Sequence, residues 1–231
     1  MTVGPGLSSI EHMLQGMSQR QADACAADAR AHGWHDTCVD YPRWYLKRWH
    51  FLPEGYLSRR SAWGYEAVIR PVYHVASEAQ MLRSVVARAA RQAPARILDL
   101  GCGPGHALQA FARAFPAALL TGVDLSPFLL ERAEATLAAF DNRVRLVHGD
   151  ATRLQLEDEA FDAAFAAHLI GHLPVRKAAE ALAEARRTLR PGGRLYLIDH
   201  AWHPTLAPGF RLIGERRLNG GIIRFRWLER A

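Results

Sequence analysis

Three glycines at alternate positions, Gly101, Gly103 and Gly105, follow directly after the apolar run 97–100. Glycine has no Cβ atom, so a glycine-rich loop after a strand lets a ligand approach the backbone where a side chain would collide. Such loops bind nucleotides, although the same triplets also form plain tight turns. His106 stands at the sixth position, where a dinucleotide-binding loop has glycine. The loop therefore predicts a nucleotide-type ligand and disfavours a dinucleotide.

Two aspartates stand where a nucleoside would need hydrogen-bond acceptors. Asp124 closes the apolar run 119–123, and a carboxylate there can accept hydrogen bonds from both ribose hydroxyls. Charge-assisted hydrogen bonds of this kind contribute about 1.5–3 kcal/mol each. Asp150 follows the run 144–147, where its carboxylate could accept from an adenine amino group. Either aspartate alone is compatible with a helix cap or a turn. Turn chemistry does not explain why the glycine loop, Asp124 and Asp150 follow three successive strands in order.

The elements that must position these residues are predicted by apolar runs that alternate with helical segments from residue 96 onward. This alternation is typical of a parallel sheet built from βαβ units. Ser126, followed by Pro127, predicts the start of one helix, and Pro174 lies at the first turn of another. Pro191-Gly192-Gly193 should end that second helix and turn the chain into a strand. The predicted strands are 97–100, 119–123, 144–147, 163–167 and 195–198, and 210–215 with 222–227 should form an antiparallel hairpin.

Residues 1–92 lack strand alternation and are predicted to be helical. Ile10, Met13, Leu14 and Met17 have the spacing of one amphipathic helix face. A capping-box pattern at Ser77 and Gln80 predicts a second helix over 78–92. We therefore expect two parts, an N-terminal helical extension over 1–92 and a ligand-binding domain over 93–231.

Composition narrows the protein class. A chain of 231 residues that is 49% hydrophobic and 23% charged suits one globular domain with a short extra segment. The first residues lack a signal peptide and no stretch approaches the ~20 apolar residues of a membrane span, so we expect a cytoplasmic protein. The three cysteines have no pairwise metal spacing, which disfavours a zinc site or a disulfide framework. The net charge of +6 comes without a recognised nucleic-acid motif, so we expect no nucleic-acid partner.

Five segments together resemble the class I S-adenosylmethionine-dependent methyltransferases. They are Arg-Ile-Leu-Asp-Leu-Gly-Cys-Gly-Pro-Gly (96–105), Thr-Gly-Val-Asp-Leu-Ser-Pro (121–127), His-Gly-Asp-Ala (148–151), Phe-Asp-Ala (161–163) and Leu-Arg-Pro-Gly-Gly-Arg-Leu (189–195). The resemblance covers roughly residues 95–228. It implies S-adenosylmethionine as methyl donor and an α/β, Rossmann-like sheet of seven strands in the order 3-2-1-4-5-7-6, with the last strand antiparallel. The chain departs from the family at 200–209, which is too short for the usual helix.

The resemblance also assigns roles to the residues singled out above. The glycine loop would hold the methionine part of the donor, with Asp99 supporting its amino end. Asp124 would take the ribose. Asp150 with Ala151 would hold the adenine, flanked by Leu125.

Histidines mark the expected acceptor side. Ligands of open α/β sheets lie beyond the carboxyl ends of the strands, so the acceptor should lie over the fourth and fifth strands. His168 and His200 follow these strands and could take a proton from a phenol, an acid or an amine, so they are our candidate catalytic residues. For His172 and His203 a structural or loop role is the simpler interpretation. Metal ligation by His168, Asp199 and His200 lacks tight ligand spacing, so we expect no metal.

Aromatic residues are concentrated in the N-terminal segment, which holds four of the six tryptophans and five of the six tyrosines. Such side chains suit a lid over an apolar or aromatic acceptor, and the core of a small helical subdomain would use them equally well. Arginines and lysines lie among them, which is compatible with peripheral contact to a membrane surface.

We thus expect a methyltransferase that acts on a small molecule by in-line methyl transfer. Nucleic-acid amino methylation is disfavoured because residues 167–170 lack the Asn/Asp-Pro-Pro-aromatic motif, and cytosine C5 methylation because no cysteine lies near that edge. An NAD-dependent oxidoreductase is disfavoured by His106. A protein that uses the donor structurally, as a cyclase or a non-catalytic partner, stays open. So do a membrane-surface methyltransferase of quinones or lipids and a homo-oligomeric state.

Overall fold

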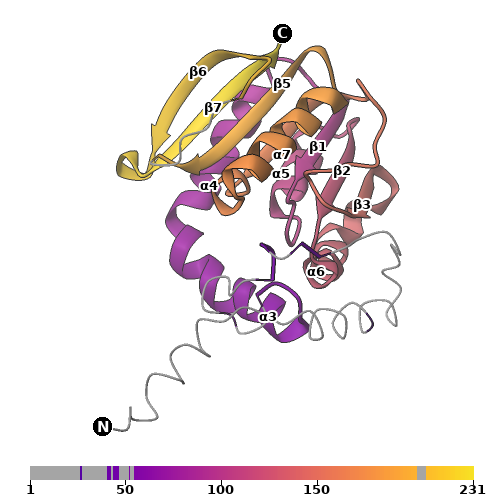
Figure 1. Ribbon diagram of the computed structural model, residues 1–231, viewed down its shortest axis with the longest axis vertical. Helices are drawn as coiled ribbons and strands as arrows, with labels where there is room; N and C mark the ends of the chain where they lie inside the picture. Colours follow the sequence, from indigo (N-terminus) through magenta and orange to yellow (C-terminus); the bar gives the residue numbers. More distant parts are fainter. Residues whose placement is uncertain (1–26, 28–40, 43, 47–51, 53–54, 202–206) are drawn as a thin grey trace, which may run out of the picture.

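The computed structural model describes residues 27, 41–42, 44–46, 52, 55–201 and 207–231 (Figure 1). The amphipathic face predicted from Ile10 to Met17 lies outside these residues, and so does His203.

The centre of the fold is a seven-stranded sheet in the predicted order, β3-β2-β1-β4-β5-β7-β6. Strands β1 to β5 are parallel, while β7 is antiparallel to both β5 and β6, so the predicted fold class is confirmed. The strands are β1 (Arg96–Leu100), β2 (Leu119–Asp124), β3 (Val144–His148), β4 (Phe161–Ala167), β5 (Leu189–His200), β6 (Phe210–Leu218) and β7 (Ile223–Arg230).

Strand β5 is longer than predicted because the turn at Pro191-Gly192-Gly193 is a bulge inside the strand. Leu189 pairs with Phe161 and Arg194 pairs with Ala163, so 190–193 are accommodated opposite a single residue of β4. A Cβ atom at Gly193 would lie 2.8 Å from the Arg190 carbonyl oxygen, so only glycine fits there. The helix therefore ends earlier, and the strand starts earlier, than the sequence pattern predicts.

Helices cover both faces of the sheet. Ser126 begins α6 as predicted, because its Oγ accepts a hydrogen bond from the Leu129 N–H at 3.1 Å. Pro174 precedes α7 as its N-cap instead of lying inside the first turn. The helices after β1 are α5 (His106–Ala114), α6 (Pro127–Leu137) and α7 (Val175–Thr188), with 3₁₀ turns η2 (Ala138–Arg143), η3 (Ile170–His172) and η4 (Asn219–Gly221).

The capping box predicted at Ser77 is wrong. Three helical segments follow one another without a break: α3 (Arg59–Gly64), the π-helical turn η1 (Tyr65–Ile69) and α4 (Arg70–Ala89). The Arg70 N–H donates to the Tyr65 carbonyl oxygen, so η1 carries the helix directly into α4 and no new start is needed at Ser77. The helix also ends at Ala89, before the predicted residue 92, and Ala93 then has a φ of 44°.

Two hydrophobic clusters hold the layers together. On one face, Val85 of α4 and Phe111 of α5 pack with Phe225 of β7. On the other face, Leu182 of α7 packs with Leu197 of β5. Figure 1 shows α7 in front of the sheet and α4 behind it, with α3 beneath the carboxyl ends of the parallel strands. These ends therefore form one edge at which the predicted site residues can meet.

Candidate functional site

The glycine loop is bound to β2 through its backbone. Gly101 and Cys102 both donate N–H hydrogen bonds to the Val123 carbonyl oxygen, at 2.8 and 3.0 Å. Gly101 and Gly103 have positive φ values, 69° and 51°, which L side chains rarely adopt. A Cβ atom at Gly103 would meet no other heavy atom within 4 Å, so the space above this residue is open. The loop leaves room for a ligand against its backbone.

Gly105 lies where α5 packs on α6. It is the left-handed N-cap of α5, with a φ of 83°. A Cβ atom here would lie 2.9 Å from Leu137 Cδ1 and 3.2 Å from Ala133 Cβ. Gly105 therefore allows the start of α5 to pack closely on α6, and it lines neither of the cavities described below.

Asp124 connects the glycine loop to the start of α6. Its Oδ2 accepts from the Gly103 N–H and its Oδ1 from the Ser126 N–H, both at 2.8 Å. Burial raises the pKa of Asp124, and backbone N–H groups of Ser126, Gly103 and Leu125 only partly oppose that shift. A carboxylate can accept about four hydrogen bonds, so Asp124 retains acceptor capacity for a ribose hydroxyl.

Asp150 combines the two roles considered for it. Its Oδ1 accepts from the Thr152 N–H at 2.8 Å, which is the turn role. It also lines the main cavity together with Leu125 and Ala151. An adenine could therefore lie between Leu125 and Ala151, with the Asp150 carboxylate within reach of its amino group.

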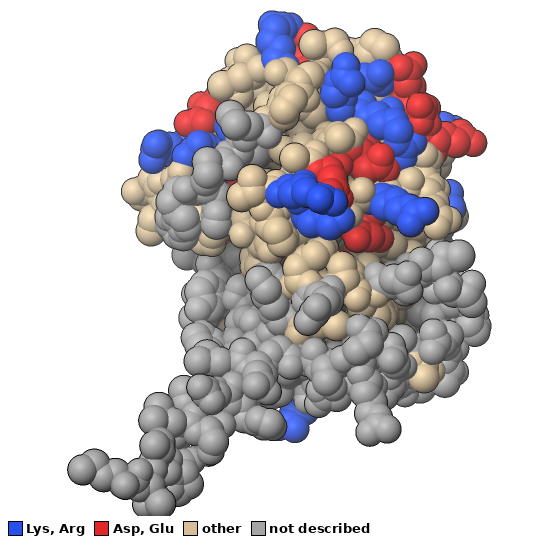
Figure 2. All heavy atoms as spheres, viewed as in Figure 1, with Lys and Arg blue, Asp and Glu red and all other residues tan. Residues whose placement is uncertain are grey.

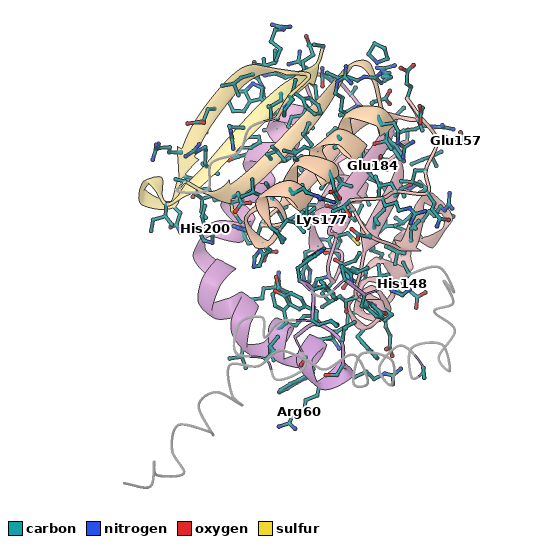
Figure 3. All side chains as sticks on the ribbon, in the orientation of Figure 1. Arg60, His148, Glu157, Lys177, Glu184 and His200 are labelled. Carbon is teal, nitrogen blue, oxygen red and sulfur yellow. The ribbon has the colours of Figure 1, made fainter. Side chains whose placement is uncertain are left out.

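The main cavity gathers residues from the ends of β1 to β5. It is lined by Gly101, Gly103, Asp124, Leu125, Asp150, Ala151, His168, Asp199 and His200, together with Trp44, Tyr45, Tyr56 and Tyr65. His148 and His200, both labelled in Figure 3, end β3 and β5 and mark the two sides of this edge. Of the predicted site residues, only Asp99 and Gly105 lie outside this cavity.

Asp99 lines an adjoining cavity, which shares Gly101, Gly103 and His168 with the first. Burial, and then the charge of Asp124, raise the pKa of Asp99 to about 8. Its Oδ2 is buried and accepts no hydrogen bond from the described residues. A buried acceptor without a partner is costly, so it indicates a ligand with a donor such as an ammonium group.

The adjoining cavity also contains Arg70 and Glu78, which sequence reasoning missed. Arg70 Nη2 lies 2.6 Å from Glu78 Oε2, while the buried Arg70 Nε has no partner among the described residues. An arginine and an aspartate in one cavity suit an amino-acid ligand, because the guanidinium can bind its carboxylate and the Asp99 carboxyl can bind its ammonium group. The helix prediction over 78–92 placed Glu78 at a helix start and Arg70 outside the helix, so no motif singled them out.

His168 and His200 are close together in the main cavity. Their ring centroids lie 5.3 Å apart. His168 has a φ of 54°, an uncommon conformation for a residue other than glycine, and its N–H donates to the Ile198 carbonyl oxygen at 2.8 Å. Asp199 accepts from the His200 N–H at 2.8 Å and from the Gly171 N–H at 2.6 Å. Backbone hydrogen bonds thus join the end of β5 to the segment after β4.

Five aromatic side chains form a wall on the N-terminal side of the main cavity, and all but Tyr41 line it: Tyr41, Trp44, Tyr45, Tyr56 and Tyr65. Tyr41 and Tyr45 stack with ring centroids 6.1 Å apart, and Tyr56 meets Tyr65 edge to face at 5.6 Å. Burial raises the pKa of Tyr65 to about 12, and it also raises the pKa values of Tyr45 and Tyr56. These tyrosines are therefore neutral at physiological pH.

The two ends of the wall have different neighbours. Tyr41 and Tyr45 pack with Leu125, next to the place expected for the nucleoside. Tyr65 lines both cavities, as does His168. It therefore lies where the two cavities meet.

His106, the residue that disfavours a dinucleotide, connects α5 to the N-terminal helices. Its Nε2 lies 3.2 Å from Glu66 Oε1, and Glu66 also pairs with Arg132 of α6. Burial, followed by the charge of Arg70, lowers the pKa of His106. The sixth loop position thus anchors η1 beside the cavity.

S-adenosylmethionine fits the residues of the two cavities. Asp99 Oδ2 needs a donor, the surface above Gly103 is open, and Asp124 retains acceptor capacity. Together these groups match an ammonium, a chain lying over the loop and a ribose. We found no comparable support for a metal, because the described residues contain no group of three or more His, Cys, Asp or Glu side chains that could hold one.

Comparison with known proteins agrees with this geometry. The sequence profile of the family described as "Methyltransferase domain" matches residues 97–193. The 27-O-demethylrifamycin SV methyltransferase of Amycolatopsis mediterranei is 37% identical over 52% of this chain and 44% of its own length. The ubiquinone/menaquinone biosynthesis C-methyltransferase of Syntrophotalea carbinolica is 36% identical over 55% of each chain. This chain thus spans about half the length of these two relatives.

Solved structures show the same fold. A TehB-like S-adenosylmethionine-dependent methyltransferase from Corynebacterium glutamicum has a TM-score of 0.60 at 20% identity, covering 75% of this chain and 100% of its own. The [4+2]-cyclase SpnF has a TM-score of 0.53 at 18% identity, covering 59% of this chain and 74% of its own. Given the matched segment and the strand order, the chain carries a methyltransferase domain of the class I S-adenosylmethionine-dependent family.

Two further observations concern partners. None of the helices in the described part of the chain is long and apolar enough to cross a membrane. On the face shown in Figure 2, basic and acidic side chains are interspersed. Examples on α7 are the pairs Arg176–Glu180 and Arg187–Glu184, with N–O distances of 3.0 and 2.8 Å.

Proposed function

We propose that this chain binds S-adenosylmethionine and transfers its methyl group to a small apolar or aromatic molecule. One observation carries the proposal: residues from three successive strand ends, Gly103, Asp124 and Asp150, line the same cavity as His168 and the aromatic wall. We call the ends of β1, β2 and β3 the donor half of the site, and the ends of β4 and β5 the acceptor half.

The donor supplies an activated methyl group on a sulfonium, so the protein mainly has to align two substrates and exclude water. Alignment alone can supply as much as ~7–11 kcal/mol. In the donor half, Asp99 would accept from the ammonium, Asp124 from the ribose hydroxyls and Asp150 from the adenine amino group. In the acceptor half, the aromatic wall would cover the reaction site.

His168 is the first candidate for acceptor positioning or proton removal, and His200 is the second. Both line the main cavity, and His168 also lines the one that contains Asp99. An imidazole there could take the proton of a phenol or an acid as the methyl group arrives. His172 lines the cavity too, but its Nδ1 is hydrogen-bonded to the His168 carbonyl oxygen, which supports a structural role.

The aromatic wall would serve both substrates. Tyr41 and Tyr45 pack with Leu125 and would cover the nucleoside. Tyr65, which lines both cavities, would contact the acceptor, so the acceptor lid that the sequence suggested is restricted to this end of the wall. The two relatives are named for 27-O-demethylrifamycin SV and for ubiquinone and menaquinone biosynthesis, so rifamycin-like and quinone-like molecules are the first acceptors to test.

Donor binding provides the first test. Calorimetry should show binding of S-adenosylmethionine and S-adenosylhomocysteine. Asp124→Ala should weaken both by about 1.5–3 kcal/mol or more, because the ribose hydroxyls lose a charged acceptor. Asp158→Ala is the matched control, since Asp158 is an exposed carboxylate paired with Arg187. Normal affinity in Asp124→Ala would remove Asp124 from the site, and binding of NAD in place of these nucleosides would overturn the proposal.

Product analysis provides the second test. The full chain is incubated with deuteromethyl-labelled donor and separate panels of phenols, aromatic acids, quinols and amines, and products are identified by mass. A labelled product establishes the acceptor class. Donor that stays intact while an acceptor is rearranged would instead support the structural use of the donor, as a cyclase of this fold would use it.

A further inference from the structure

Trp44, a residue of the aromatic wall, carries a buried polar atom that needs a partner. Its indole Nε1 has no hydrogen-bond partner among the described residues. An indole N–H can only donate, and a buried one usually meets an acceptor because an unmade hydrogen bond is costly. Trp44 lines the main cavity. A molecule bound in that cavity is therefore the candidate source of the missing acceptor.

The chain offers an internal comparison, because Trp227 of β7 also has a buried Nε1 without a partner among the described residues. Trp227 lines neither cavity. Its ring packs tightly on β6, where a Cβ atom added at Gly214 would lie 2.3 Å from Trp227 Cζ2 and 3.0 Å from its Nε1. The guanidinium carbon of Arg88 lies 4.4 Å from the centre of the ring. Trp227 is thus enclosed by packed protein, whereas Trp44 borders open space.

Trp44 lies at the part of the main cavity where an adenine is expected. Its ring meets Tyr45 edge to face, with ring centroids 5.8 Å apart. It packs against the hydrophobic cluster that contains Leu125 and also against the one that contains Ala151, and among the described wall residues it alone does both. It does not line the adjoining cavity, which contains Asp99. The indole therefore lies at the nucleoside end of the site and not at the methionine end.

The polar groups of an adenine complement those on this part of the lining. The three carboxylates of the main cavity, Asp124, Asp150 and Asp199, accept backbone N–H groups, and none of them accepts from Trp44. Adenine carries one amino group, which donates, and three ring nitrogens, N1, N3 and N7, which accept. An ionised Asp150 can only accept and suits the amino group, whereas Trp44 can only donate and suits a ring nitrogen.

We propose that the Trp44 N–H donates a hydrogen bond to a ring nitrogen of the adenine of S-adenosylmethionine and so helps to select the base. The inference rests on the proposed function and deepens it, because it adds a specificity-determining residue to the nucleoside site. Trp44 lies outside residues 97–193, the segment that matches the family profile. Recognition of the adenine would thus depend in part on the N-terminal extension.

The test replaces one ring nitrogen at a time. The full chain is titrated calorimetrically with S-adenosylhomocysteine and with its 1-deaza, 3-deaza and 7-deaza analogues, in each of which C–H replaces one nitrogen. In the wild-type chain, the analogue that lacks the partner of Trp44 should bind about three- to tenfold more weakly than the parent, the usual effect of one hydrogen bond. In Trp44→Phe, which keeps an aromatic ring but has no N–H, the same analogue should bind as tightly as the parent.

Trp227→Phe is the matched control, since it removes an equally buried N–H outside both cavities. It should leave the affinity ratios of all three analogues at their wild-type values. A role of Trp44 in packing alone would also leave these ratios unchanged, because a smaller ring weakens the parent and its analogues alike. Trp44→Leu provides the same measurement if Trp44→Phe does not fold.

The outcomes distinguish the two proposals. Wild-type affinities that are equal for the parent and all three analogues overturn the assignment without any variant. Ratios that are the same in Trp44→Phe as in the wild-type chain assign the hydrogen bonds to other groups and overturn it as well. In both cases S-adenosylhomocysteine still binds, so the proposed function stands. Failure of the wild-type chain to bind S-adenosylhomocysteine overturns the proposed function instead.

Discussion

The donor half and the acceptor half of the site are held in shape by different parts of the chain. In the donor half, backbone N–H groups of Gly103 and Ser126 hold the Asp124 carboxylate, and the loop is tied to the Val123 carbonyl. In the acceptor half, the lining consists mainly of side chains from three separate regions, among them His168, His200 and Tyr65. Main-chain geometry tolerates most changes elsewhere, whereas a side-chain lining changes with each substitution.

This difference explains why a shared donor and a variable acceptor can coexist in one fold. The donor half needs a few glycines and aspartates at strand ends. The acceptor half can be altered residue by residue without moving the sheet. Substitutions in the two halves should therefore affect different measured quantities.

The largest effect is expected in the acceptor half, at His168. If the acceptor is a phenol or an acid that ionises only on binding, His168→Ala should lower turnover by on the order of 10²–10⁴ at saturating donor. His168→Asn is the matched variant, because asparagine tolerates the positive φ of this position but is no base. Turnover is measured against pH for both variants and for His200→Ala. Wild-type rates and an unchanged pH profile in all three would leave alignment as the only catalytic contribution.

In the donor half, the expected effect at Asp99 is on donor binding and not on turnover. With a pKa of about 8, the free protein holds this proton at neutral pH, and an ammonium group next to the carboxylate should release it. Donor binding near pH 7 should therefore release up to about one proton, seen as a binding enthalpy that depends on the ionisation enthalpy of the buffer. Asp99→Asn should abolish this dependence. The same enthalpy in all buffers for the wild-type chain would contradict the predicted release.

The raised pKa of Asp99 also predicts how the stability of the fold depends on pH. The folded chain holds a proton that the unfolded chain releases between pH 4 and 8, so stability should fall as pH rises through that window. Asp99→Asn should flatten this slope in denaturant titrations at several pH values. A slope that persists unchanged would assign it to another group.

Close packing behind the donor half should contribute to the free energy of unfolding. A Cβ atom at Gly122 of β2 would lie 2.5 Å from Leu108 Cδ1 and 2.9 Å from Cys102 Sγ. Gly122→Ala should therefore cost about 1–3 kcal/mol of unfolding free energy, measured by chemical denaturation. At Gly149 the nearest atom would be Val123 Cγ1 at 3.5 Å, an ordinary contact, so Gly149→Ala is the control. Equal stability of the two variants would show that the core beside Gly122 adapts.

The smallest effects should come from the aromatic wall, where the two halves meet. Tyr45→Leu should weaken donor binding, and Tyr65→Leu should raise the Michaelis constant of the acceptor. Each effect should be about 0.5–1.5 kcal/mol, the contribution of one aromatic contact. Calorimetry for the donor and steady-state kinetics for the acceptor separate the two. If both variants affect the same substrate, the wall covers only one half of the site.

Much of the fold could be predicted because its signals are local. Short apolar runs between helical segments indicate the parallel strands, and Ser126 before Pro127 indicates a helix start. Other features depend on tertiary structure. The bulge at Gly193 follows from pairing with β4, and Ser77 lies within a helix because η1 extends that helix from upstream. Neither has a signal in the neighbouring residues.

The site follows the same division. The alternating glycines and the strand-end aspartates have fixed spacing, so sequence alone predicted a common cavity for most of the donor half. Gly105 lines neither cavity, and the close packing that an added Cβ atom would meet there comes from α6, which the loop spacing does not indicate. Arg70 and Glu78 of α4 belong to no motif. Only the packing of α4 brings them to the cavity that Asp99 lines.

The π-helical turn η1 makes the orientation of the aromatic wall depend on a single residue. A π turn amounts to one residue inserted into an α-helix, and each residue of an α-helix advances the chain by about 100° around its axis. Loss of one codon within 65–69 would leave α3 and α4 as one regular helix. Helix α3 and Tyr56 would then rotate by about 100° relative to α4, carrying Tyr56 away from the cavity while α4 stayed packed on the sheet. A single in-frame deletion in η1 should therefore reshape the lining of the main cavity without altering the sheet.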